Sequence, residues 1–337
     1  MIFSNAHGLY CLSISELDEH SKDLVSSGIR ATTQKTYNSA QKSYLEFCNL
    51  YHLIPLPATE QIILWYIAYL NLKKLSPSTV HVYLSALRSL HVMSDLAPPD
   101  IFTPKVKLSL KSIAEASPPP VQKHPITYSL LSNMFKLVPM CLDGQMYRAA
   151  LALGFFAALR SHEYLVSELD SNSTALLLSH VSFAVNDGLK CMTLQIPKSK
   201  TTPHGFTVTV GCSLTEVCAV CCLKEYLKSR YLLTPCKLSH YMFINSQGIA
   251  LTKSLFNEYI KKLVARLGLF PSLYSAHSLR AGATTTAATL SQPFQDWELQ
   301  VLGNWRSDTY KRYVRNFDTH TVKFSQRLTN QSGLKLS

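Results

Sequence analysis

The chain has 337 residues, of which 47% are apolar, and its 33 lysines and arginines exceed its 21 aspartates and glutamates by 12. This length and apolar content exclude a disordered tail and a mini-protein, and they favour about two folded domains. Because only 16% of the residues are charged and that small set is strongly basic, we expect a polyanionic partner.

The sequence predicts a soluble, intracellular protein without a membrane partner. The longest apolar stretch, near Ala149–Leu159, is shorter than the roughly 18–20 residues that a membrane-spanning helix needs. The N-terminus lacks the cationic start and continuous apolar centre of a secretory signal. Nine scattered cysteines are an odd number and do not suggest a disulfide framework, so we expect a reducing compartment.

The first domain is predicted to be a small helical bundle over residues 1–96, ordered from about residue 14. Apolar residues recur at helical spacing over 31–51 and 61–72. A third helix begins at Ser76-Pro77, where a serine cap and a proline in the first turn are typical of a helix start, and it runs to about Met93.

Residues 97–123 are predicted to be a basic, proline-rich linker. Tandem prolines at 98–99 and 118–120 flank this segment and favour an extended chain. Lys105, Lys107 and Lys111 lie between them. These lysines are candidate contacts for a phosphate backbone, although a solvated basic linker explains them equally well.

The second domain, residues 124–337, is predicted to be mainly helical with a small antiparallel sheet. A capped helix starts at Thr127, and an apolar helix covers 147–159. Alternating residues predict strands over 189–197 and 205–211, joined by a basic turn that contains Lys198 and Lys200. Helices follow over 216–230, 255–267, 277–290, 295–302 and 308–317.

Four short segments of this domain carry residue types suited to phosphate chemistry. They are Arg160-Ser161-His162-Glu163, the basic turn from Lys198, His277-Ser278-Leu279-Arg280, and Gly303-Asn304-Trp305 followed by Arg312-Tyr313-Val314-Arg315. Each segment alone is a weak signal, since an arginine at a helix edge or one of 17 tyrosines usually has a structural role. Their order along the chain is more informative.

That order resembles the tyrosine recombinase family over roughly residues 20–325. The resemblance implies a SAM-like helical core-binding domain followed by a tyrosine recombinase catalytic domain. The Arg-Tyr-Val-Arg ending and the Lys-Ser-Lys turn are most similar to recombinases of eukaryotic mobile elements, namely DIRS-like and Ngaro-like retroelements and Crypton transposons.

The resemblance implies four catalytic residues here and a fifth residue that positions them. Tyr313 is the nucleophile that attacks the scissile phosphate and forms a 3′-phosphotyrosyl link. Arg160 and Arg280 grip the non-bridging oxygens, because guanidinium offers paired donors to phosphate. His277, one helical turn before Arg280, assists proton transfer, and Glu163 holds His277 or Arg160 in place. Such chemistry needs neither a metal ion nor ATP, so no cofactor is expected.

Two further residues complete the implied site. Lys200 protonates the departing 5′ oxygen, with Lys198 as the alternative and as a DNA contact. Trp305 stands where the family has histidine or tryptophan, and an indole N–H can donate to a phosphate oxygen. A core tryptophan is the competing interpretation of Trp305.

The sequence departs from the family pattern at two places. Tyr313 lies eight positions after Trp305, one fewer than the commonest family interval, and Tyr310 lies between them as a rival nucleophile. We prefer Tyr313 because its neighbours reproduce the family ending, whereas Tyr310 fits a packing role. Asn304 also stands where the family often has another residue.

The segment Cys218-Ala219-Val220-Cys221-Cys222, with Cys212 and Cys236 nearby, is a candidate zinc site. A structural zinc site normally shows two spaced pairs of ligands. These cysteines instead run into the apolar face of a helix, which favours buried free thiols. The sequence therefore predicts no metal site.

The function implied by the resemblance is that of a site-specific recombinase or integrase. It would cut and rejoin double-stranded DNA during integration or excision of a mobile element, as a dimer on one site and a tetramer in synapsis. Its location would be the nucleus if the source is eukaryotic. The alternatives are an inactive DNA-binding protein derived from such an enzyme and a type IB topoisomerase.

Overall fold

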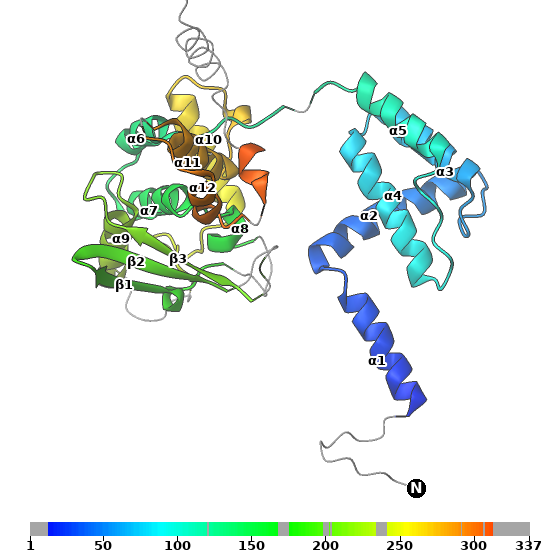
Figure 1. Cartoon of the computed structure of the whole chain (residues 1–337), viewed down its shortest axis with the longest axis horizontal. Helices are drawn as coiled ribbons and strands as arrows, with labels where there is room; N and C mark the ends of the chain where they lie inside the picture. Colours follow the sequence, from blue (N-terminus) through cyan, green and yellow to red (C-terminus); the bar gives the residue numbers. More distant parts are fainter. Residues whose placement is uncertain are drawn as a thin grey trace, which may run out of the picture. The chain divides into compact units, whose positions relative to one another are not determined.

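The computed structural model describes residues 13–119, 121–167, 175–197, 202, 204–233, 241–290, 292–305 and 307–312. The chain divides into two compact units, residues 1–120 and residues 121–337. Figure 1 colours the first unit from blue to cyan-green and the second from green to orange-red. Among the described residues, no helix is both long and apolar enough to cross a lipid bilayer.

The described part of the first unit consists of helices. They are α1 (Ile14–Ser27), α2 (Ala31–Leu50), α3 (Glu60–Leu72), α4 (Pro77–Met93) and α5 (Pro104–Ala116). The three helices predicted from the sequence correspond to α2, α3 and α4. Thr59 and Ser76 cap α3 and α4 by accepting hydrogen bonds from backbone N–H groups. Apolar residues from α2 to α5 share one core, which includes Tyr44, Tyr66 and Leu84.

The prediction of an extended linker over residues 97–123 is wrong for its central part, which is helix α5. Val106, Leu110 and Ile113 on one face of α5 are buried in the core of the first unit. Thr103 caps the helix and Pro104 occupies its first turn, so this proline starts a helix instead of extending the chain. The chain passes between the units only after Ala116.

The three lysines predicted to contact DNA from a linker therefore belong to this helix. Lys105, Lys107 and Lys111 are exposed on α5. Lys105 forms an ion pair with Glu60 at 3.7 Å, and Lys111 forms one with Glu115 at 3.7 Å. Their contact with DNA stays a prediction.

The described part of the second unit combines helices with one sheet. Its helices are α6 (Tyr128–Leu137), α7 (Leu142–Phe156), α8 (Ser161–Tyr164), α9 (Ala219–Leu233), α10 (Lys253–Arg266), α11 (His277–Thr289) and α12 (Asp296–Leu302). Short 3₁₀ turns are η1 (Leu178–His180), η2 (Pro271–Leu273) and η3 (Asp308–Arg312). The mainly helical architecture with a small sheet is as predicted.

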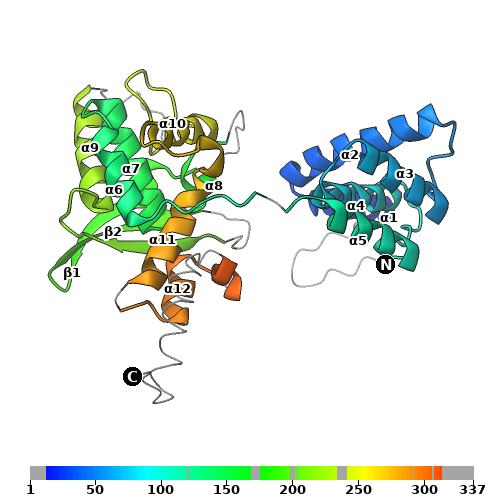
Figure 2. The same cartoon turned by 90° about the horizontal axis from the view of Figure 1, so that it is seen from above.

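The sheet has the antiparallel order β1-β2-β3, with strands β1 (Val181–Asn186), β2 (Leu189–Ile196) and β3 (Phe206–Gly211). The two predicted strands are β2 and β3, and their register places Leu194 opposite Val208. The first strand, β1, was not predicted. In the views of Figure 1 and Figure 2, β1 and β2 lie below α6 and α7.

Helix α7 lies in the core of the second unit and positions the first candidate site residue. It packs against α9 and α11, and its side chains are buried on most faces. The helix ends at a turn in which Ala158 has a φ of 44°. This left-handed conformation is costly for alanine and stops the helix. Arg160 follows in an extended conformation, directly before α8.

Candidate active site

Arg160 is held by a buried carboxylate one turn further along the chain. Its guanidinium Nη1 donates to Oε1 of Glu163 at 3.0 Å, and its backbone N–H donates to Oε2 at 2.7 Å. The Glu163 side chain is 0% exposed, whereas that of Arg160 is 21% exposed. Of the two partners predicted for Glu163, the structure therefore shows Arg160. The carboxylate fixes the arginine and leaves it an exposed edge.

Removing this carboxylate should destabilise the protein strongly. Glu163→Ala leaves a partly buried guanidinium without its counter-charge, so we expect the free energy of unfolding to fall by about 3–5 kcal/mol. Glu258→Ala is the matched control, because its ion pair with Lys262 at 2.7 Å joins side chains that are 60% and 68% exposed. An exposed pair contributes at most about 1 kcal/mol. Urea unfolding measures both values, and equal losses would contradict the structural role of Glu163.

Arg280 is buried and donates hydrogen bonds to the backbone of two neighbouring segments. Its Nη1 donates to the carbonyl of Ala158 at 2.5 Å, and its Nη2 donates to the carbonyl of Gly303 at 2.5 Å. The residue is 2% exposed. Since Ala158 lies two residues before Arg160, this arginine ties α11 to the turn that presents the other arginine.

Trp305 stacks on Arg280, with the guanidinium carbon 4.2 Å from the centre of the indole ring. The turn after α12 sets this position. A Cβ on Gly303 would lie 2.0 Å from the Trp305 ring, so glycine makes room for the indole. Trp305 is 8% exposed and packs with Leu299. It is thus both a core residue and a neighbour of the buried arginine.

The local backbone conformation explains the asparagine at position 304, where the sequence departs from the family pattern. Its φ is 48°, in the left-handed region that asparagine tolerates better than most residues. The backbone N–H of Trp305 then donates to the carbonyl of Gln300 at 2.9 Å, which closes a Schellman-type helix end. Asparagine at this place terminates α12 and directs the chain towards Trp305.

His277 begins α11 and faces a cleft that it shares with Arg160. Because the helix runs from His277 to Thr289, His277 and Arg280 are one turn apart, as predicted. The cleft has a volume of about 350 Å³ and is lined by Arg160, Ser161, His162, Lys253, Asn257, Ser275, Ala276 and His277. An imidazole and a guanidinium thus meet at one polar cavity.

Three residues of this cleft were missed by the sequence analysis. Oδ1 of Asn257 accepts a hydrogen bond from the backbone N–H of Ala276 at 2.7 Å and so anchors the turn before His277. Lys253 is exposed at the start of α10, and His162 follows Arg160 directly. For His162, the sequence signal was its position inside the Arg160–Glu163 segment. Lys253 and Asn257 gave no such signal, because their helix, α10, approaches the site only in the folded chain.

His162 should make the protein less stable in acid. Burial lowers the pKa of His162; the Glu163 carboxylate opposes this shift, and the charges of Arg160, Lys253 and Arg280 add to it. The native state therefore binds fewer protons than the unfolded chain as the pH falls below the unfolded pKa of about 6.5. Stability from the neutral imidazole is present above that pH and is lost below it.

We expect His162→Gln to remove this part of the acid sensitivity. The difference in unfolding free energy between the wild type and the variant should change by up to about 1.4 kcal/mol per pH unit below pH 6.5 and stay constant above it. Urea unfolding across this range measures the difference. A constant difference at all pH values would show that the imidazole does not titrate differently in the two states.

Tyr310 is a packing residue of the second unit. It is 1% exposed and belongs to a cluster with Ala287, Leu299 and Trp305. Its ring lies 6.4 Å from that of Trp305, measured between centroids. Burial raises the pKa of Tyr310, and the nearby Asp296 carboxylate adds to this effect.

Three residues assigned from the sequence, Tyr313, Lys198 and Lys200, lie outside the described residues. The choice of Tyr313 as nucleophile and of Lys200 as general acid therefore stays a prediction. What the structure does bring together is Arg160, its partner Glu163, His277, Arg280 and Trp305. The cleft brings together the Arg160 guanidinium and the His277 imidazole, and both groups suit the binding of a phosphodiester.

No family model and no curated protein matches this sequence, but solved structures match most of the chain. The XerH site-specific recombinase bound to palindromic difH substrate, a post-cleavage complex, has a TM-score of 0.60 at 17% identity and covers 87% of this chain and 78% of its own. The Tn1549 transposon integrase in complex with transposon right end DNA has a TM-score of 0.56 at 14% identity, covering 90% and 98%.

A lambda integrase dimer bound to a COC′ core site has a TM-score of 0.55 at 18% identity, over 90% of this chain and 79% of its own. These likenesses concern the backbone, since the identities are low. The helices and the small antiparallel sheet of this chain therefore have the fold of the tyrosine recombinases.

Proposed function

We propose that this chain is a site-specific recombinase or integrase that cuts and rejoins DNA through a 3′-phosphotyrosyl intermediate. The observation that carries the proposal is the convergence of Arg160, His277, Arg280 and Trp305, which come from three segments far apart in the sequence. A buried arginine contacting the turn of a second arginine is a costly arrangement for stability alone. Phosphate binding by Arg160 and Arg280 would explain why the chain keeps this costly arrangement.

The proposed reaction is an in-line displacement at phosphorus. The Tyr313 hydroxyl oxygen forms a new bond to the phosphorus, while the bond to the 5′ oxygen of the next nucleotide breaks. His277 takes the phenol proton, and Lys200, or alternatively Lys198, gives a proton to the departing 5′ oxygen. The guanidiniums of Arg160 and Arg280 stabilise the charge on the non-bridging oxygens. Religation is the same sequence in reverse, so the bond energy is kept without ATP.

Double-stranded DNA is the proposed partner. The net charge of +12 favours a polyanion, and the XerH, Tn1549 integrase and lambda integrase structures are DNA complexes, the last of them a dimer. By analogy we propose a dimer on each site and a tetramer when two sites pair. The Lys-Ser-Lys and Arg-Tyr-Val-Arg sequences support a mobile element of DIRS, Ngaro or Crypton type as the source, and hence a nuclear location.

The test is covalent trapping on nicked duplexes that carry the repeats flanking the coding sequence in its genome. After cleavage the short fragment diffuses away, so the covalent protein–DNA adduct accumulates and survives denaturing electrophoresis. An adduct through tyrosine supports the proposal. Specific binding without any adduct would indicate the inactive DNA-binding protein, and relaxation of supercoils without site preference would indicate the topoisomerase.

Lys253 should contribute to DNA affinity through a phosphate contact. It is exposed at the cleft that Arg160 and His277 line. We expect Lys253→Ala to weaken binding to all sequences equally and to reduce the slope of log affinity against log salt concentration by about 1. Lys261→Ala, on the same helix but outside the cleft lining, is the control and should change the slope less. Fluorescence anisotropy at several salt concentrations measures both, and equal slopes for the two variants would remove Lys253 from the interface.

A further inference from the structure

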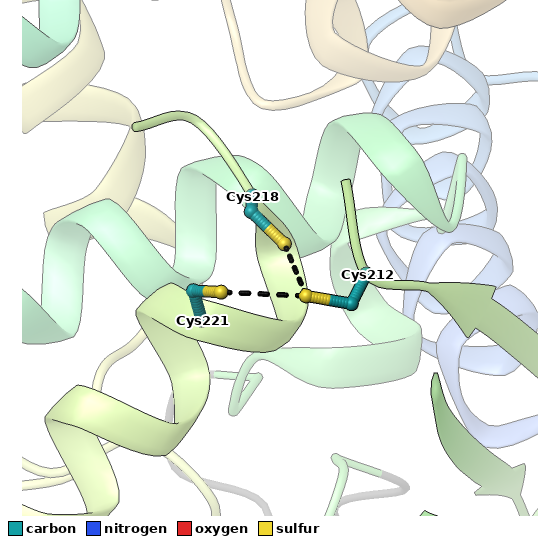
Figure 3. A group of neighbouring side chains, drawn as sticks. All are labelled: Cys212, Cys218 and Cys221. Carbon is teal, nitrogen blue, oxygen red and sulfur yellow. Dashed lines mark hydrogen bonds between the residues drawn. The ribbon is translucent and has the colours of Figure 1, made fainter. Parts of the chain in front are cut away.

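Three cysteine thiols meet where the sheet of the second unit joins the following helix (Figure 3). Cys212 follows β3, and Cys218 and Cys221 lie just before and within the first turn of α9. The sulfur of Cys212 is 3.4 Å from that of Cys221 and 3.5 Å from that of Cys218. All three sulfurs lie within 4.8 Å of one another.

The backbone fixes this meeting point on both sides. The N–H of Cys212 donates to the carbonyl of Lys190 at 2.7 Å, which continues the β2–β3 ladder by one residue. Cys218 accepts at its carbonyl the first bond of α9, from the N–H of Cys222 at 2.9 Å. The thiols are thus carried by a sheet and a helix, and only a short loop joins these two elements.

The spacing of the sulfurs matches that of a tetrahedral thiolate site. A zinc ion binds cysteine sulfur at about 2.3 Å, so two ligands at the tetrahedral angle lie about 3.8 Å apart. The separations of 3.4 and 3.5 Å are slightly shorter than this value, and the third is no more than 4.8 Å. An ion at the centre of the three sulfurs would need only small side-chain rotations.

A bound cation would hold the three sulfurs as thiolates, because its charge offsets the repulsion between them.

We propose that Cys212, Cys218 and Cys221 bind one thiophilic divalent cation of the Zn²⁺ class, with water in the fourth position. The ion would tie the end of β3 to the start of α9. This proposal departs from the sequence-based expectation of buried free thiols, because a third sulfur, at the end of the sheet, lies beside the Cys218-x-x-Cys221 pair. Neither Cys212 nor Cys221 is fully buried, so an ion can reach them.

Cys222 provides the matched control within the same helical turn. Its sulfur contacts the carbonyl of Glu216 at 3.7 Å, and it does not belong to the three-sulfur group. A variant at this position changes the cysteine count without removing a proposed ligand.

The first experiment is titration of the reduced full chain with Co²⁺ as a spectroscopic probe. We expect one equivalent to bind with an intense sulfur-to-cobalt charge-transfer band, and Zn²⁺ to displace it. Cys212→Ser should lower the affinity by at least about 100-fold, whereas Cys222→Ser should leave the band and the affinity unchanged. Absence of the band in the wild type, or a band that survives in Cys212→Ser, overturns the proposal.

The second experiment uses only the wild-type chain, so it does not depend on the folding of a variant. Alkylation followed by mass spectrometry should show that Zn²⁺ protects the three proposed ligands, while the exposed Cys141 stays reactive. Zn²⁺ at a hundredfold excess over its dissociation constant should also raise the melting temperature by about 5–10 °C. Equal alkylation with and without Zn²⁺, or protection that disappears once a Cys212–Cys221 disulfide has been reduced, overturns the site.

Discussion

Tyr313→Phe is expected to abolish covalent capture of nicked DNA while leaving DNA binding within about twofold of the wild type. Removing the nucleophile of a covalent mechanism lowers the rate by on the order of 10⁴-fold or more, since no other group can form the intermediate. Binding persists because the positive charges and the folded domains are unchanged. Denaturing electrophoresis of the adduct and anisotropy of the same labelled duplex measure the two quantities side by side.

Tyr310→Phe is the matched control for this prediction. The substitution keeps the ring that packs against Trp305 and removes only a hydroxyl from a residue that is 1% exposed. We therefore expect adduct formation to stay within about threefold of the wild type, as for a packing residue. Loss of the adduct in Tyr310→Phe with retention in Tyr313→Phe would transfer the nucleophile to Tyr310 and would require η3 to open.

The helices that the sequence predicted are those with clear caps and apolar periodicity. Ser76-Pro77 marks the start of α4, and the apolar spacing of 277–290 and 295–302 predicted α11 and α12 almost to the residue. These signals are local, since each depends on hydrogen bonds or side chains within about one turn. Local signals therefore located most of the elements that carry the site.

The elements that were missed carried signals of the same kind. Thr103-Pro104 precedes α5 as Ser76-Pro77 precedes α4, but the tandem prolines on either side of α5 outweighed it. In β1, Val181, Phe183 and Val185 alternate with smaller or polar residues before a turn, which is typical of a hairpin strand. In both places the local signal was present in the sequence but was given too little weight.

The geometry of the site, in contrast, depends on contacts between distant segments. No local pattern indicates that Arg280 donates to the carbonyls of Ala158 and Gly303, or that Asn257 anchors the turn before His277. The same holds for Cys212, which meets the α9 cysteines only because β3 ends beside that helix. Order along the chain predicted which residues matter, while tertiary structure decides how they are held.

Comparing Arg280→Lys with Arg230→Lys should distinguish a catalytic role for Arg280 from a purely structural one, because Arg230 is a structural arginine. Both arginines are buried and both donate to two backbone carbonyls, Arg230 to those of Tyr241 and Met242 at 2.8 and 2.6 Å. Lysine cannot reproduce the planar pair of donors. We expect each variant to lose about 2–4 kcal/mol of unfolding free energy, because a buried charge keeps only part of its hydrogen bonds.

The two variants should differ in cleavage. Arg280 stacks on Trp305 and bonds to the turn that presents Arg160, so its replacement removes a donor to the transition state and should slow adduct formation by about 10²–10³-fold. Arg230 supports α9, and its variant should cleave at nearly the wild-type rate at a temperature where it is folded. Single-turnover rates, taken where circular dichroism shows both variants folded, make the comparison. Equal slowing in both would mean that the buried guanidinium of Arg280 only stabilises the fold.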